Sequence, residues 1–132
     1  MSRKSRQRGT TRLSDLKLRV MAEYESSGIW VIEQIGPFRH GGVGYDWLNL
    51  PPSLAQRFKR WIVTYWAYYD QAMFDEEYPE FKGFVFDIDA FNQEGRELAY
   101  QLKAHLGPEC YVEFQPESNE GKGLGMAETI SL

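Results

Sequence analysis

The sequence is poor in the residues that build disulfides, metal sites and membrane spans. It has one cysteine, Cys110, and two histidines among 132 residues, which excludes an intrachain disulfide and a cysteine-rich zinc site. No stretch approaches the roughly 20 consecutive apolar residues that a transmembrane helix needs. The basic residues near the N-terminus have no apolar run behind them, which argues against a secretory signal peptide. We therefore expect a cytoplasmic protein with no cofactor, no bound metal and no membrane contact.

Aromatic residues, in contrast, are in excess. The 8 Phe, 8 Tyr and 4 Trp make up 15% of the chain, which is more than an average core requires. A chain of this length suits one domain. We expect a disordered basic arm over residues 1–12, a single α+β domain over 13–115, and a flexible tail or edge strand over 116–132.

The strongest local pattern predicts a helix over residues 50–74, with Ser53 as its N-cap after two prolines. Apolar residues recur there at three- and four-residue spacings: Leu54, Phe58, Trp61, Ile62, Tyr65, Tyr69 and Met73. One face of the helix must therefore be buried, and we expect it to pack on a sheet. Trp66 and Tyr68 lie outside that stripe and need a second surface, either another helix or a partner.

A second helix is predicted over residues 87–107, with Asp87 or Asp89 as its N-cap and Gly107 at its end before a proline. Gly95 lies on the apolar face of this helix, where an interior glycine costs about 1 kcal/mol relative to alanine. We expect it to be tolerated because a ring approaches closely there. Two rings are candidates to fill that notch: Trp61 and Trp66.

Period-two alternation predicts strands at residues 16–24 and 110–114, and a short β-rich run at 29–33 completes a hairpin with the first. Residues 36–47 contain four glycines and no periodicity, so we expect a loop there. The predicted fold is α+β: a small, mainly antiparallel sheet of three to four strands with two helices on one face, in the order β-β-α-α-β.

Charge is distributed unevenly. Residues 1–20 hold seven bases and one acid, a balance of +6, and the other 8 bases and 18 acids give −10. An acidic run with interleaved aromatic residues follows the first predicted helix. We take it, with two aromatic residues of that helix, as the candidate partner-binding surface: Trp66, Tyr68, Asp70, Asp75, Glu76, Glu77, Tyr78 and Glu80. Aromatic residues are enriched at binding hot spots, and a basic protein such as a toxin domain is the expected partner.

A catalytic function has less support from the sequence. The Asp87-Ile88-Asp89 sequence after an apolar run resembles the start of a haloacid dehalogenase motif, but the downstream residues of that chemistry are missing, and helix capping accounts for both acids. His40 in the glycine-rich loop has no orienting partner nearby in sequence, although a small hydrolase using it with acids of the 75–89 region stays as an alternative. His105 in the last turn of the second helix suits the negative end of the helix dipole.

The basic arm supplies another alternative, a nucleic-acid-associated protein. Its cations would contact phosphates without sequence specificity: Arg3, Lys4, Arg6, Arg8 and Arg12. An acidic body would repel the same polyanion, and no known nucleic-acid-binding motif follows the arm. We therefore rank nucleic acid below a protein partner.

The run from Trp47 through LPPSLAQRFKRW, followed by FNQEGRELAYQLKAHLG, resembles small bacterial proteins of the toxin-immunity type. The resemblance covers residues 16–114 and rests on core patterns and helix caps, so it implies a fold more than an activity and assigns no functional residue. With the acidic body and the aromatic surplus, it favours a non-catalytic immunity protein or antitoxin that occludes a basic toxin domain. The sequence does not set the oligomeric state.

Overall fold

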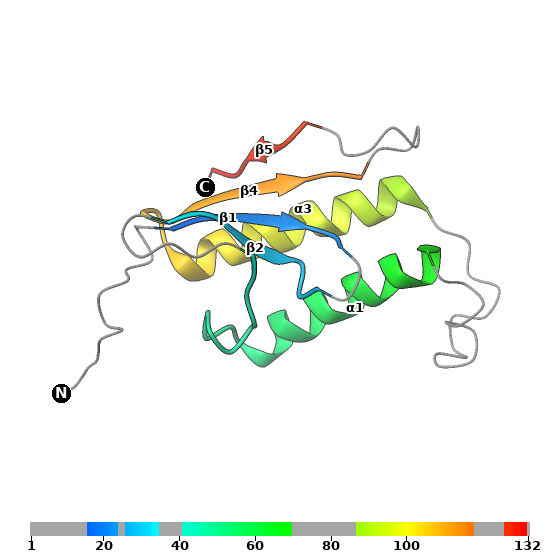
Figure 1. Ribbon diagram of the computed structural model, residues 1–132, viewed down its shortest axis with the longest axis horizontal. Coiled ribbons are helices and arrows are strands. Elements are labelled where there is room, and N and C mark those ends of the chain that lie inside the picture. The colour runs from blue at the N-terminus through cyan, green and yellow to red at the C-terminus, as the bar shows by residue number, and fades with distance from the viewer. Residues whose placement is uncertain (1–15, 24–25, 35–40, 70–86, 118–125, 132) are drawn as a thin grey trace.

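The computed structural model describes residues 16–23, 26–34, 41–69, 87–117 and 126–131. These residues form a two-layer arrangement of a sheet and two long helices (Figure 1). The elements are β1 (Leu16–Met21), β2 (Ile29–Gln34), β3 (Gly41–Gly42), α1 (Pro52–Tyr69), α3 (Ile88–Leu106), β4 (Tyr111–Gln115) and β5 (Glu128–Thr129). The expected α+β class with two helices is confirmed for these residues.

The sheet differs in detail from the prediction. It has five strands in the order β3-β2-β1-β4-β5, and β1 pairs parallel with β4 although its pairing with β2 is antiparallel. Three of the four pairings among the described strands are antiparallel, but the expected number of three to four strands and the order β-β-α-α-β were wrong, and the parallel pair was not predicted. A parallel pair requires a long crossover, and the chain between β2 and β4, with both helices, supplies it.

The two additional strands are edge strands of two residues each. β3 lies within the segment that was predicted to be a loop, where Gly41 and Gly42 pair with β2. β5 pairs antiparallel with β4 at the opposite edge, with Thr129 beside Glu113. Strands this short show no alternation of side chains. β5 lies within residues 116–132, where a flexible tail or an edge strand was expected, whereas β3 was not expected.

Alternate residues of the central strands face the helices. Leu18 and Val20 of β1 and Val112 and Phe114 of β4 are fully buried, and Phe114 contacts the ring of Trp61 in α1. Their neighbours in sequence point to the other face. Both helices therefore cover the same face of the sheet, as predicted, and neither of these two described helices lies on the other face (Figure 1).

The first helix begins two residues earlier than a cap at Ser53 predicts. α1 starts at Pro52, and the Ala55 amide donates to the Pro51 carbonyl at 3.0 Å. Pro51 therefore occupies the cap position, and the prediction of Ser53 was wrong because the fixed φ of Pro52 suits the first helical residue, where no amide hydrogen is needed.

The predicted buried stripe of α1 is confirmed over the residues whose side chains the structure describes. These are Leu54, Phe58, Trp61, Ile62 and Tyr65, all at most 8% exposed. The side chain of Tyr69 and the whole of Met73 lie outside the described residues, as does the predicted continuation of the helix to Phe74.

The predicted ends of α3 are confirmed. Asp87 is the N-cap, and its carboxylate accepts a hydrogen bond from the Ala90 amide at 3.0 Å. Gly107 follows the helix with φ of 100°, and its amide donates to the Lys103 carbonyl at 2.9 Å. Of the two aspartates considered, Asp87 makes the cap and Asp89 lies in the first turn.

The predicted notch at Gly95 is present, and Trp61 fills it together with Phe114. A Cβ on Gly95 would lie 2.6 Å from Trp61 Cζ2 and 2.6 Å from Phe114 Cε1, far inside van der Waals contact. The glycine thus allows α3 to approach both α1 and the sheet. Neither of the described helices combines the length and the apolarity that a bilayer crossing requires.

Candidate functional site

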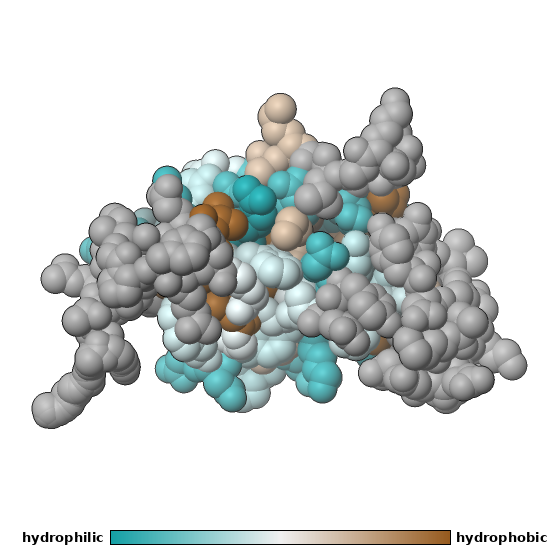
Figure 2. Space-filling model, viewed as in Figure 1, coloured by the Kyte–Doolittle hydropathy of each residue, from teal (hydrophilic) through white to brown (hydrophobic). Residues whose placement is uncertain are grey.

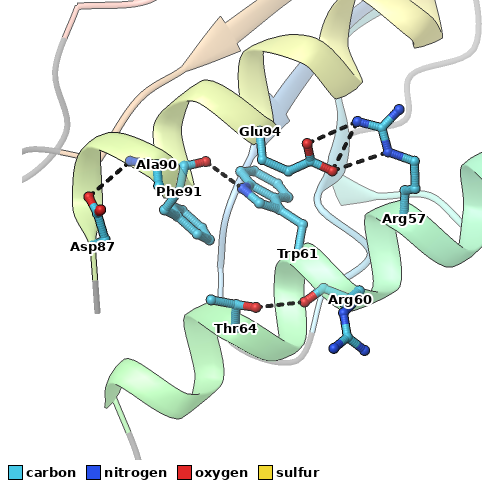
Figure 3. Close-up of a pocket in the computed structure, with 8 residues that line it drawn as sticks. All are labelled: Arg57, Arg60, Trp61, Thr64, Asp87, Ala90, Phe91 and Glu94. Carbon is cyan, nitrogen blue, oxygen red and sulfur yellow. Dashed lines mark hydrogen bonds and ion pairs between the residues drawn. The ribbon is translucent and has the colours of Figure 1, made fainter. Parts of the chain in front are cut away.

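A groove of about 340 Å³ lies between the two helices on the described part of the surface (Figure 3). Eight residues line it: Arg57, Arg60, Trp61 and Thr64 of α1, Asp87 at the N-cap of α3, and Ala90, Phe91 and Glu94 of α3. On α3 these positions recur at three- and four-residue spacing, so they share one face. The groove therefore follows the seam where the helices pack.

Two stacked rings form the floor of the groove. The rings of Trp61 and Phe91 lie 4.8 Å apart between centroids with an interplanar angle of 14°. Trp61 Nε1 also donates to the Phe91 carbonyl at 2.9 Å, so the indole has its polar atom satisfied although the residue is only 3% exposed. The floor is thus apolar, rigid and held by both helices.

An ion pair crosses the groove at one end. Arg57 donates to both carboxylate oxygens of Glu94, with Nη2 at 2.9 Å from Oε1 and Nε at 3.1 Å from Oε2, as Figure 3 shows. The hydrogen bond to Glu94 raises the pKa of Arg57 above its ordinary value, and the charges of Glu94 and Glu97 raise it further. Both partners are more than 40% exposed in their side chains, so water screens the pair and its contribution to stability is small.

The two helices bordering the groove differ in charge. α1 contains three bases, Arg57, Lys59 and Arg60, and no acid. The first half of α3 exposes acids, among them Asp89 and Glu97. A partner that lies across the groove would therefore meet opposite signs on its two sides.

The face of the sheet opposite α1 and α3 carries a second polar network. Glu113 of β4 is nearly buried, with 9% of its side chain exposed, and it forms an ion pair with Arg19 of β1. Tyr111 Oη donates to the other Glu113 oxygen at 2.7 Å and lies 3.2 Å from Thr129 Oγ1. Lys17 Nζ lies 5.6 Å from the centre of the Tyr111 ring. These contacts link β1, β4 and β5, so they have a structural role in the sheet.

Two further polar contacts tie α3 to residues that follow β4 in the chain. Arg96 pairs with Glu128 of β5 at 2.8 and 2.9 Å, and this hydrogen bonding lowers the pKa of Glu128. Asn92 exchanges two hydrogen bonds of 2.9 Å with the backbone of Glu117. Burial raises the pKa of Glu117, and the charge of Glu23 raises it further.

Few of the sequence-predicted site residues fall within the described structure. Trp66 is partly buried and packs against the core, and Tyr68 lies in α1 with a side chain outside the described part. Six members of the predicted surface are outside the described residues: Asp70, Asp75, Glu76, Glu77, Tyr78 and Glu80. The same holds for the five cations of the arm, Arg3, Lys4, Arg6, Arg8 and Arg12, and for His40.

The remaining chemical candidates have structural roles. Asp87 caps α3. His105 lies in the last turn of that helix, and its Nε2 is 3.3 Å from the Leu48 carbonyl oxygen. Within the described ranges no group of three or more His, Cys, Asp or Glu residues is arranged to hold a metal ion.

The groove and its Arg57–Glu94 pair were not predicted. The two residues are 37 positions apart, and no local pattern joins them. Part of the pairing could be seen in the sequence, because Arg57 and Arg60 lie on the polar side of the first predicted helix. Glu94 lies about one turn after Phe91 in the second predicted helix. Only the packing of the helices at Gly95 brings the two rows together.

Comparison with known proteins gives one informative result. Neither a search of curated proteins nor a search of solved structures found a match. A scan against protein families, however, matches residues 16–117, from the start of β1 to just past β4, to the family described as Serratia CdiI immunity protein-like. The resemblance to toxin-immunity proteins is thereby confirmed, and the chain belongs to the Serratia CdiI immunity protein-like family.

Proposed function

We propose that the protein is an immunity protein that binds a toxin domain and blocks it by occlusion. The observation that carries this proposal is the family match over residues 16–117, which spans both helices and the central strands. The polar groups described in the groove and on the sheet face hold elements of the fold together.

A more specific proposal concerns the sign of the charge on the partner's binding surface. Residues 70–97 contain nine acids and two bases, a balance of −7, and this stretch runs into the exposed first half of α3. The acidic segment that includes Asp75, Glu76 and Glu77 would thus continue onto Asp89 and Glu97. A basic toxin domain would be attracted to such a surface, with aromatic residues contributing to slow dissociation.

Protection of cells is the direct test. The toxin domain encoded by the neighbouring gene is expressed in a susceptible host with and without this protein, and binding of the purified partners is measured by calorimetry. We expect full protection and a 1:1 complex. Growth arrest despite soluble immunity protein, together with no heat of binding, would contradict the proposal.

The charge component needs its own experiment. Reversing Asp75, Glu76 and Glu77 to lysine should weaken the complex, and the affinity of the parent protein should fall as salt rises. Removal of residues 1–12 should leave protection unchanged. An affinity that does not respond to the reversals would eliminate the acidic-surface version and leave the immunity role in place.

A further inference from the structure

The groove between α1 and α3 combines an apolar floor with rims of opposite charge. The stacked rings of Trp61 and Phe91 and the exposed Ala90 supply the apolar part. Arg60 stands on the α1 side and Glu97 near the Arg57 end on the α3 side, where its charge acts on Arg57. We propose that this groove is a docking site for the toxin domain, which inserts an apolar side chain between a basic residue facing α3 and an acidic residue facing α1.

The size of the groove favours a side chain as its occupant. At about 340 Å³ it lies at the lower end of the range of ligand pockets, about 300–1,000 Å³. This volume accommodates one or two side chains. Interface hot spots are typically such anchors in well-packed pockets, surrounded by contacts that exclude water.

The charges argue for a macromolecular partner. The acids of α3 extend beyond the lining, since Asp89 and Glu97 are exposed on that helix without lining the groove. A small ligand inside the groove would not meet these groups. A protein segment lying across both helices would meet them, and the opposite signs would fix its orientation.

The site is also prepared before binding. Trp61 is held by its hydrogen bond to the Phe91 carbonyl and by the ring stack, and the exposed Arg57–Glu94 pair links the two helices at one end. An anchor therefore enters a formed groove, which reduces the ordering cost of association.

The test fills the groove without changing charge. Ala90→Tyr places a ring at its edge, and Ala104→Tyr is the matched control, because Ala104 is also an exposed alanine of α3 but lies outside the groove. Binding to the toxin domain encoded by the neighbouring gene is measured for both full-length variants. We expect Ala90→Tyr to raise Kd at least about tenfold and Ala104→Tyr to leave it within about threefold. Circular dichroism shows whether each variant is folded, and Thr64→Tyr, which enters from α1, replaces Ala90→Tyr if that variant unfolds.

Charge reversal tests the orientation. Arg60→Glu should weaken binding, whereas Lys59→Glu, on the same helix but outside the groove, should have the smaller effect. Because the inference rests on the proposed function, the wild-type protein separates the two failures. If the wild type binds the toxin domain and Ala90→Tyr binds it equally well, the groove proposal alone is overturned. The same holds if Lys17→Glu, on the sheet face, loses binding while the groove variants keep it. Absence of wild-type binding overturns the proposed function and the groove with it.

Discussion

Replacing Gly95 by alanine tests the central packing contact of the fold. The added methyl carbon would lie 2.6 Å from one ring carbon of Trp61 and from one of Phe114. Ordinary contacts begin at 3.4 Å, so the rings or the helix must move by about 0.8 Å. Trp61 has little room, since it stacks on Phe91 and donates to that residue's carbonyl.

Two opposing effects set the size of the change. Overpacking a well-filled core costs about 1–3 kcal/mol, and the rigid surroundings of Gly95 place the cost at the upper end. Alanine regains about 1 kcal/mol of helix propensity. We therefore expect a net loss of about 2 kcal/mol in the free energy of unfolding, which for a domain of this size lowers Tm by about 8 °C.

Urea denaturation of Gly95→Ala and of an Ala104→Gly control measures both effects. The control, at an exposed position of the same helix, should lose about 1 kcal/mol through propensity alone. Adding Phe114→Leu to Gly95→Ala should make the double variant more stable than additivity predicts, because the smaller side chain relieves the clash. A Gly95→Ala protein as stable as the wild type, or more stable, would refute the close approach of α3 to Trp61 and Phe114.

Three other substitutions have definite expected outcomes. Asp87→Ala should lower the free energy of unfolding by about 1 kcal/mol through loss of the N-cap, with Asp89→Ala losing less in the same urea titration; equal losses would contradict the cap assignment. Arg19→Met should cost about 2 kcal/mol, since it leaves the nearly buried carboxylate of Glu113 without its cation, and Glu113→Gln in the same chain should restore part of the loss. Glu117→Gln and Glu128→Gln should show opposite pH dependence in thermal melts. The folded-state pKa of Glu117 is raised, so its ionisation destabilises the fold as pH rises through that pKa, and Glu117→Gln should have a higher Tm than the wild type at pH 7 but not at pH 4. The folded-state pKa of Glu128 is lowered, so Glu128→Gln should have a lower Tm than the wild type at pH 7, with a smaller difference as the pH falls.

Sequence patterns predicted the parts of the fold that local chemistry determines. The stripe through Phe58 and Trp61 and the cap at Asp87 depend on residues within a few positions of one another, and the notch was predicted because Gly95 lies on the apolar face of its own helix. Ser53 was predicted as the cap of α1 because hydroxyl caps are common, yet Pro52 fixes the first helical φ. The parallel pairing of β1 with β4 and the two-residue edge strands depend on backbone contacts between distant segments, about which side-chain periodicity carries no information.

The candidate site was harder to predict than the fold for the same reason. The sequence drew attention to aromatic residues outside the buried stripe of α1, but Trp61, one of the residues within it, forms the floor of the groove. Its ring is buried against α3 on one side and borders the groove on the other, so that one residue serves both the core and the surface. This double role follows from Gly95, since a larger residue there would push Trp61 and α3 apart. If the groove receives the toxin, Gly95→Ala should therefore weaken toxin binding even in protein that is still folded. Arg19→Met, which is expected to destabilise the fold by a similar amount but lies on the opposite face of the sheet, should leave toxin binding unchanged.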